Sequence, residues 1–138
     1  MASASLIFAG DRLDPSRVTV LLGVQPTTAY RKDEVYKRSR GHEVIGRTGL
    51  WLLSSHGHVK SDQLNDHLAY LKAIIFPPGQ GDLVGSIKKL MREEGGLEAE
   101  ISCFWYGEHG ATPPLIPEEI RAAFSRIGAT IETDFDTD

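Results

Sequence analysis

The chain has 138 residues, the length of one domain, and 41% of them are hydrophobic, enough to bury a core without a metal or a disulfide. The net charge of −4 argues against a general nucleic-acid binder, and the single cysteine, Cys103, excludes an intramolecular disulfide. No apolar run approaches the roughly 18 residues of a membrane span, and the N-terminus lacks a secretory signal pattern. We therefore expect a soluble cytoplasmic protein that forms a single domain over residues 1–138.

The first predicted elements are a strand and a short helix. Residues 3–9 are rich in Leu, Ile and Phe and alternate weakly, which is typical of a strand that begins a sheet. Asp14 then provides an oxygen that can cap a helix, and Pro15 takes the first helical position, where a missing N–H has no cost. Gly23 ends this helix after about two turns.

Residues 30–47 form a basic arm. Two short β-prone pieces, 34–38 and 43–45, are separated by an Arg-Gly pair and predict a hairpin that leads into the next strand. Residues 31–47 carry a net charge of +3 against −4 for the whole chain, which leaves −7 for the remainder. The charged residues of the arm are Arg31, Lys32, Lys37, Arg38, Arg40 and Arg47, with Asp33, Glu34 and Glu43.

Residues 48–55 are the most β-prone apolar run of the chain. Leu50, Trp51, Leu52 and Leu53 place apolar side chains on both faces of an extended chain, whereas a strand with one exposed face would alternate. The run therefore predicts an inner strand of a sheet that is covered on both sides.

Two amphipathic helices are predicted next. In the first, Ser61 is the candidate N-cap, an apolar stripe repeats at helical spacing, and Pro77 and Pro78 prevent continuation. The second is capped by Asp82 and ends at the glycines 95–96. The stripes consist of Leu64, Leu68, Leu71 and Ile75 in the first helix and of Leu83, Ile87, Leu90 and Met91 in the second.

The C-terminal third predicts a strand, a helix and a strand. Residues 97–106 alternate most clearly, with Cys103 and Trp105 on the face assigned to the core and Phe104 and Tyr106 on the other face. The remaining elements are a helix over residues 117–127 and a strand over residues 129–135.

The predicted elements follow the order β-α-β-α-α-β-α-β, with the hairpin inserted before the strand at 48–55. This order favours an α+β fold in which helices pack on one face of a mixed or mostly antiparallel sheet of four or five strands. In such a fold we expect both tryptophans, Trp51 and Trp105, to be largely buried.

Several short motifs resemble one known family. They are Leu13-Asp14-Pro15, Leu-Gly-Val-Gln-Pro-Thr at 22–27, Thr-Gly-Leu-Trp at 48–51, and residues 127–131 with Asp134. Through them the chain is similar over nearly its whole length to the bacterial family called domain of unknown function 4279. Its C-terminus departs modestly, since Asp134-Phe135-Asp136 stands where the family tends to have Asp, an aliphatic residue and Tyr. The resemblance implies no established reaction and no catalytic residues, and some relatives look like partners in toxin–immunity loci.

His56 and His58 are the residues most like a metal-binding pair, because imidazoles two residues apart in an extended segment point the same way. Gly57 between them makes a solvated turn equally natural. The other candidate ligands, which show no recognisable spacing, are His42, His67, His109 and Cys103. A small metal-dependent enzyme built on this pair is the alternative function, and we assign no metal, cofactor or catalytic residue.

The binding site is predicted at the basic arm. Tyr30 and Tyr36 lie among its arginines and lysines, a composition that can contact anionic surfaces, although a solvated hairpin whose charges only maintain solubility explains it too. Phe104 and Tyr106 are expected on the sheet face away from the helices, covered by arm residues Val35, Val44 and Ile45. The candidate binding residues are Tyr30, Arg31, Lys37, Arg38, Arg40, Phe104 and Tyr106.

These observations predict a non-catalytic module that binds another protein, with an immunity-type role implied by the resemblance. The partner is expected to be an acidic protein, or a second copy that contributes its acidic residues 134–138. A membrane partner is not expected, and nucleic acid is the less favoured partner because the chain is negatively charged overall.

Overall fold

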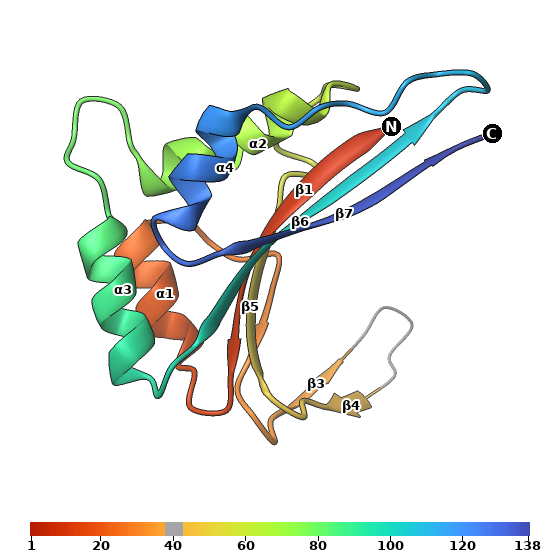
Figure 1. Cartoon of the computed structure of the whole chain (residues 1–138). Coiled ribbons are helices and arrows are strands. Elements are labelled where there is room, and N and C mark those ends of the chain that lie inside the picture. The colour runs from red at the N-terminus through yellow and green to blue at the C-terminus, as the bar shows by residue number, and fades with distance from the viewer. Residues whose placement is uncertain (38–42) are drawn as a thin grey trace.

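The computed structural model describes residues 1–37 and 43–138, and for Lys37 and Val44 it describes the backbone only. This part of the chain forms an α+β fold with a five-stranded mixed sheet and a separate two-stranded hairpin (Figure 1). The strands are β1 (Ala2–Gly10), β2 (Thr28–Tyr30), β3 (Val35–Lys37), β4 (Glu43–Ile45), β5 (Gly49–Ser54), β6 (Glu98–Gly107) and β7 (Thr130–Thr137). The helices are α1 (Pro15–Leu22), α2 (Leu64–Ile75), α3 (Val84–Glu93) and α4 (Glu118–Ser125).

The five-stranded sheet has the order β2-β5-β1-β6-β7, so β1 is its central strand. β1 is antiparallel to both β5 and β6, and β2 is antiparallel to β5. β6 and β7 are parallel, because the crossover through α4 returns the chain to the end of the sheet where β6 began. The predicted α+β class is confirmed, and the three-residue strand β2 is an addition that the sequence pattern does not predict.

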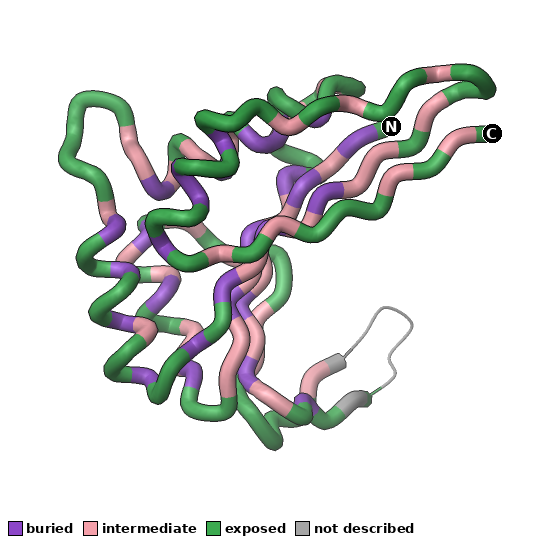
Figure 2. Tube along the Cα trace, in the orientation of Figure 1, coloured by how far each residue is buried: buried purple, intermediate pink, exposed green. Residues whose placement is uncertain are grey.

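The described helices lie on one face of the sheet (Figure 1). Burial therefore alternates along the strands, as the purple and pink segments of Figure 2 show. In β1 the side chains of Ala2, Ala4, Leu6 and Phe8 are buried, and the residues between them are only half-buried. The core thus fills the space between one sheet face and the helices, as the predicted one-sided arrangement requires.

The expectation that the strand at 48–55 is covered on both sides is wrong. Trp51 and Leu53 of β5 are fully buried beneath the helices, but Leu50 and Leu52 on the opposite face are only half-buried. The segment that precedes β5 forms β2 and the hairpin, and neither is a second layer of helices. A continuous apolar run cannot distinguish a strand covered twice from one whose second apolar face is partly exposed.

The three predicted capping residues each accept a hydrogen bond from a backbone N–H near a helix start. Asp14 is the N-cap of α1, as expected, whereas Ser61 and Asp82 lie in the turns that lead into α2 and α3. The donors are Ser16 to Asp14 at 3.1 Å, Gln63 to Ser61 at 3.0 Å and Val84 to Asp82 at 3.1 Å.

The two tryptophans differ in burial. Trp51 is fully buried, its Nε1–H donates to Thr19 Oγ1 at 3.1 Å, and its ring packs against Phe8 with centroids 6.0 Å apart. Trp105 is only half-buried near the end of β6, where it meets Phe135 of β7 edge to face. The expectation of two largely buried tryptophans holds fully for Trp51 and in part for Trp105.

We predict that Trp51→Ala lowers the free energy of unfolding by about 3–5 kcal/mol, because it empties a filled core position. Trp105→Ala should cost less. The control Val20→Ala changes a side chain of α1 that is 83% exposed and should have little effect. Urea denaturation followed by circular dichroism measures all three, and equal losses for the two tryptophans would contradict the assignment.

Candidate functional site

The sheet face opposite the helices, called the open face below, has an apolar centre. Antiparallel register places Ile7 of β1 beside Leu52 of β5, and Ala9 beside Leu50, and all four are half-buried. Tyr30 of β2 extends the second row, because it pairs with Leu50. The remaining members of the open face are Ser3, Ser5, Thr28, Ser54, Glu98, Glu100, Ser102, Phe104, Tyr106, Thr130, Glu132, Asp134 and Asp136.

The hairpin of β3 and β4 stands at one end of the open face (Figure 1). Tyr36 of β3 stacks on Tyr30 of β2, with ring centroids 4.2 Å apart and ring planes 5° from parallel. Gly46 is required beneath this stack, because a Cβ there would lie 2.6 Å from the Tyr30 ring. Two ion pairs also fasten the arm to the segment between β1 and α1: Arg31–Asp14 at 2.9 Å and Lys32–Asp11 at 3.3 Å.

The arm does not cover Phe104 and Tyr106 as expected. Val35 and Ile45 of the hairpin are 54% and 61% exposed, so they pack little against any surface. The side chain of Val44 lies outside the described residues. The expected cover fails because the hairpin pairs only with itself among the described strands and is held at its base by Tyr30.

The structure separates the predicted binding residues into two groups. Tyr30 and Arg31 lie at the hairpin end of the open face, whereas Phe104 and Tyr106 lie roughly 20 Å away along the strands. The aromatic pair is bordered by two aspartates of β7 and not by the basic arm. The residues that lie outside the described part, entirely or for their side chains, are Arg38, Arg40 and Lys37.

His56 and His58 are both exposed in the turn after β5. His58 stacks on Tyr70 of α2 with ring centroids 5.4 Å apart, and burial raises the pKa of Tyr70 above its usual range. Among residues 1–37 and 43–138, no group of three or more His, Cys, Asp or Glu side chains could hold a metal ion. This part of the chain therefore gives no support to the metal-dependent alternative.

A buried serine–histidine pair, which the sequence pattern does not predict, links β1 and β5 to α2. Ser55 Oγ accepts the N–H of Ala4 at 2.9 Å and lies 2.7 Å from His67 Nδ1. His67 Nε2 lies 2.8 Å from the carbonyl oxygen of Ser61, so this nitrogen carries the proton and Nδ1 accepts from the Ser55 hydroxyl. Because Ser55 and His67 are almost completely buried, the pair joins elements of the core and is closed to a substrate.

We predict that Ser55→Ala lowers the free energy of unfolding by about 1–3 kcal/mol, because the Ala4 N–H and His67 Nδ1 both lose a buried partner. The control is Ser54→Ala, which removes a neighbouring hydroxyl whose hydrogen bond to the His56 N–H is exposed, and should cost less than about 0.5 kcal/mol. Urea denaturation measures both. If Ser54→Ala lowers the free energy of unfolding as much as Ser55→Ala does, the buried Ser55–His67 pair contributes no more to stability than an exposed hydrogen bond.

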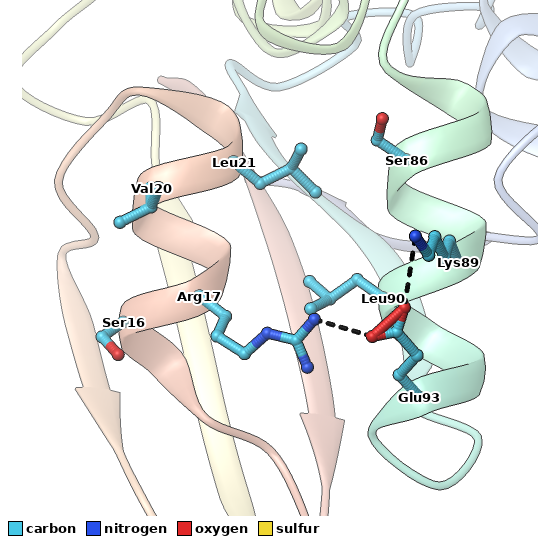
Figure 3. Close-up of a pocket in the computed structure, with 8 residues that line it drawn as sticks. All are labelled: Ser16, Arg17, Val20, Leu21, Ser86, Lys89, Leu90 and Glu93. Carbon is cyan, nitrogen blue, oxygen red and sulfur yellow. Dashed lines mark hydrogen bonds and ion pairs between the residues drawn. The ribbon is translucent and has the colours of Figure 1, made fainter.

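A groove of about 500 Å³ lies between α1 and α3 (Figure 3). Leu21 and Leu90 approach each other at its centre, and Arg17 Nη2 bridges the two helices to Glu93 Oε2 at 2.9 Å. Lys89 pairs with the same carboxylate at 3.8 Å. The hydrogen bond between Arg17 and Glu93 raises the pKa of Arg17 and lowers the pKa of Glu93. The charged side chains that line the groove thus pair with one another, and helix packing accounts for the groove.

We predict that Cys103 stays unreactive toward Ellman's reagent at about pH 8 in the native protein and reacts completely after unfolding in urea. Burial raises the pKa of the Cys103 thiol to about 11, so the reactive thiolate is scarce, and the side chain is 1% exposed. Absorbance of the released thiolate measures the reaction. Rapid reaction of the native protein would contradict the core position of Cys103.

None of the described helices is long and apolar enough to cross a bilayer, and the longest, α2, has 12 residues. No curated protein and no solved structure matches the chain. A family model described as Domain of unknown function (DUF4279) matches residues 1–138, in agreement with the motifs noted in the sequence. The match covers the whole chain, and the protein therefore belongs to the DUF4279 family.

Proposed function

We propose that this protein is a non-catalytic cytoplasmic module that binds an acidic protein through the hairpin end of the open face. The observation that supports the proposal is a sheet face with an apolar centre that no described helix covers. Contiguous apolar patches on soluble proteins commonly mark interaction sites.

The apolar centre has the composition of the core of a protein interface. Ile7 and Leu52 form one row across β1 and β5, and Ala9 and Leu50 form the next. Tyr30 continues the second row toward the hairpin and supplies an aromatic edge. Aliphatic side chains with an aromatic residue, and with charged groups only at the margin, are typical of the central part of such interfaces.

The arm indicates the charge of the partner. Residues 31–47 carry a net charge of +3. Although Arg31 and Lys32 each form an ion pair, their side chains remain 60% and 43% exposed, respectively. Each therefore keeps N–H donors that carboxylates of a partner can reach, and positive charge at a rim accelerates association with an acidic surface.

An immunity-type role, in which the partner is a toxin, is one form of this proposal and rests on the resemblance within the family. The cytoplasmic location rests on cysteine usage: Cys103 is a free thiol and the chain has no second cysteine with which to pair.

We predict that a photo-crosslinking residue in place of Leu52 captures an acidic protein in the cells that produce this chain, and that the same residue at Val20 does not. Val20 is the matched control because it is apolar and exposed but lies on α1, on the opposite side of the sheet. The captured protein is then purified, and its affinity is measured by calorimetry for wild type, Leu52→Glu and Val20→Glu. Leu52→Glu should weaken binding at least about tenfold, because it places a carboxylate against an acidic partner.

Added salt should weaken binding of the captured protein to the wild type. The triple variant Arg31→Glu, Lys37→Glu, Arg38→Glu should also bind more weakly. Circular dichroism should show that the triple variant keeps its fold. Equal affinity of Leu52→Glu and Val20→Glu for the captured protein, or capture at both positions alike, would refute the proposed surface. Loss of structure in Leu52→Glu would be detected by its melting curve, and Leu50→Glu, which places a carboxylate on the same face, then replaces it as the test.

A further inference from the structure

β7 forms one edge of the sheet. Its eight residues, Thr130–Thr137, pair with β6 on one side, and no described strand pairs with the other side. In Figure 1 the strand runs along the margin of the sheet toward the C-terminus, with no helix outside it. Because the amides of alternate residues point to opposite sides of a strand, an edge of this length presents about four outward N–H and C=O groups.

This edge is already formed and firmly held. All eight residues of β7 are in register with residues 100–107 of β6. Phe135 packs edge to face on Trp105, with ring centroids 6.2 Å apart, and Ile131 packs against the core. Because β7 is already ordered, only the incoming segment loses conformational entropy when it pairs with this edge.

Acidic side chains repeat along the same strand. Glu132, Asp134 and Asp136 are exposed and share the open face, which spaces them roughly 7 Å apart. Within the described part of the chain, no cation lies within ion-pair distance of these three carboxylates. The edge therefore combines outward backbone groups with a regular row of negative charge.

The charge row decides which strand the edge can accept. Pairing of β7 with β7 of a second copy would bring two acidic rows onto the same face of adjacent strands, where like charges repel. A strand with lysine or arginine at every second position places its cations beside Glu132, Asp134 and Asp136 instead. Its intervening residues would lie on the side of Ile131 and Phe135, which favours β-branched apolar residues there.

We infer that the outer edge of β7 binds an extended basic segment of another protein, which adds to the sheet as a sixth strand. The outer edge of β7 is a different surface from the hairpin end of the open face, and the inference does not depend on the function proposed for that end.

A cavity at the start of β7 fits this inference. It has a volume of about 440 Å³ and opens beside Thr130, because β7 first pairs at Glu100 and leaves the start of β6 without a described strand on that side. Met91 and Leu97 contribute apolar walls, and Glu98 and Glu100 line the cavity next to Ile7 of the apolar centre. A segment that continues past Thr130 would bring a lysine or arginine here, with its aliphatic stem against the walls and its charged group beside the glutamates.

The test uses a fluorescein-labelled peptide of about ten residues in which lysine alternates with valine or threonine, long enough to span β7. Anisotropy titration against the full chain is expected to show saturable binding. The same sequence with every backbone nitrogen methylated keeps every charge but has no N–H with which to form a ladder on either side, and it should bind at least about tenfold more weakly. A peptide with glutamate in place of lysine should not bind.

Charge-matched variants locate the site on the protein. Glu132→Gln, Asp134→Asn and Asp136→Asn together should weaken peptide binding at least about tenfold. The control removes three exposed acids away from the edge, through Asp62→Asn, Glu118→Gln and Glu119→Gln, and should leave the affinity within about twofold.

Two proline variants, Thr133→Pro and Asp134→Pro, distinguish the edge of β7 that pairs with β6 from the outer edge. One of the two substitutions removes an amide that bonds to β6, and the other removes an outward amide. The variant that keeps the melting temperature of the wild type is the one that lacks an outward amide. It should bind the peptide more weakly than the variant with asparagine at the same position, Thr133→Asn or Asp134→Asn, which keeps that amide.

Equal binding of the methylated and unmethylated peptides would overturn strand addition and leave only charge attraction. Equal loss in the edge variant and the control would overturn the location. No binding of the lysine peptide would overturn the inference entirely and leave the acidic row as a device that keeps the edges of separate copies apart.

Discussion

The fold depends on the register of β1, the central strand of the described five-stranded sheet. Leu6 lies beside Leu53 on one side and Ile101 on the other, and all three point to the helices. Because side chains alternate along a strand, a slip of one residue would place Ser5 and Ile7 beneath the helices and expose the present core. The burial pattern of β1 therefore fixes which face of β5 and β6 is covered, and the other elements follow from that choice.

Both candidate binding surfaces result from this one-sided burial. The helices cover a single face, so the apolar pairs Ile7–Leu52 and Ala9–Leu50 remain partly exposed on the other. The two ends of that face differ in charge: the basic arm adjoins Tyr30, and the acidic side chains of β7 adjoin Phe104. A surface with ends of opposite charge can discriminate between partners, because a match at one end is a repulsive contact at the other.

Periodicity predicted the elements whose burial alternates clearly, above all β6, since each of its faces has its own composition. It failed at β5, because Leu50 and Leu52 are apolar whether a second layer covers them or not. It also failed for the Ser55–His67 pair, which forms only when two distant elements meet. The one signal for that pair is that His67 falls between two leucines of the α2 stripe, a position where a polar side chain needs a buried partner.

The hairpin end and the start of α1 share two carboxylates. Asp14 caps α1 and pairs with Arg31, and Asp11 pairs with the arm as well. A hydrogen bond from Ser16 is the largest cause that lowers the pKa of Asp14, and a hydrogen bond from Thr48 is the largest cause at Asp11. Since both pKa values are lower in the folded protein, this stabilisation is present above the unfolded pKa and is lost as the pH falls through the folded one. Acid therefore weakens the contacts at the helix start and at the base of the arm together, because the same two carboxylates serve both.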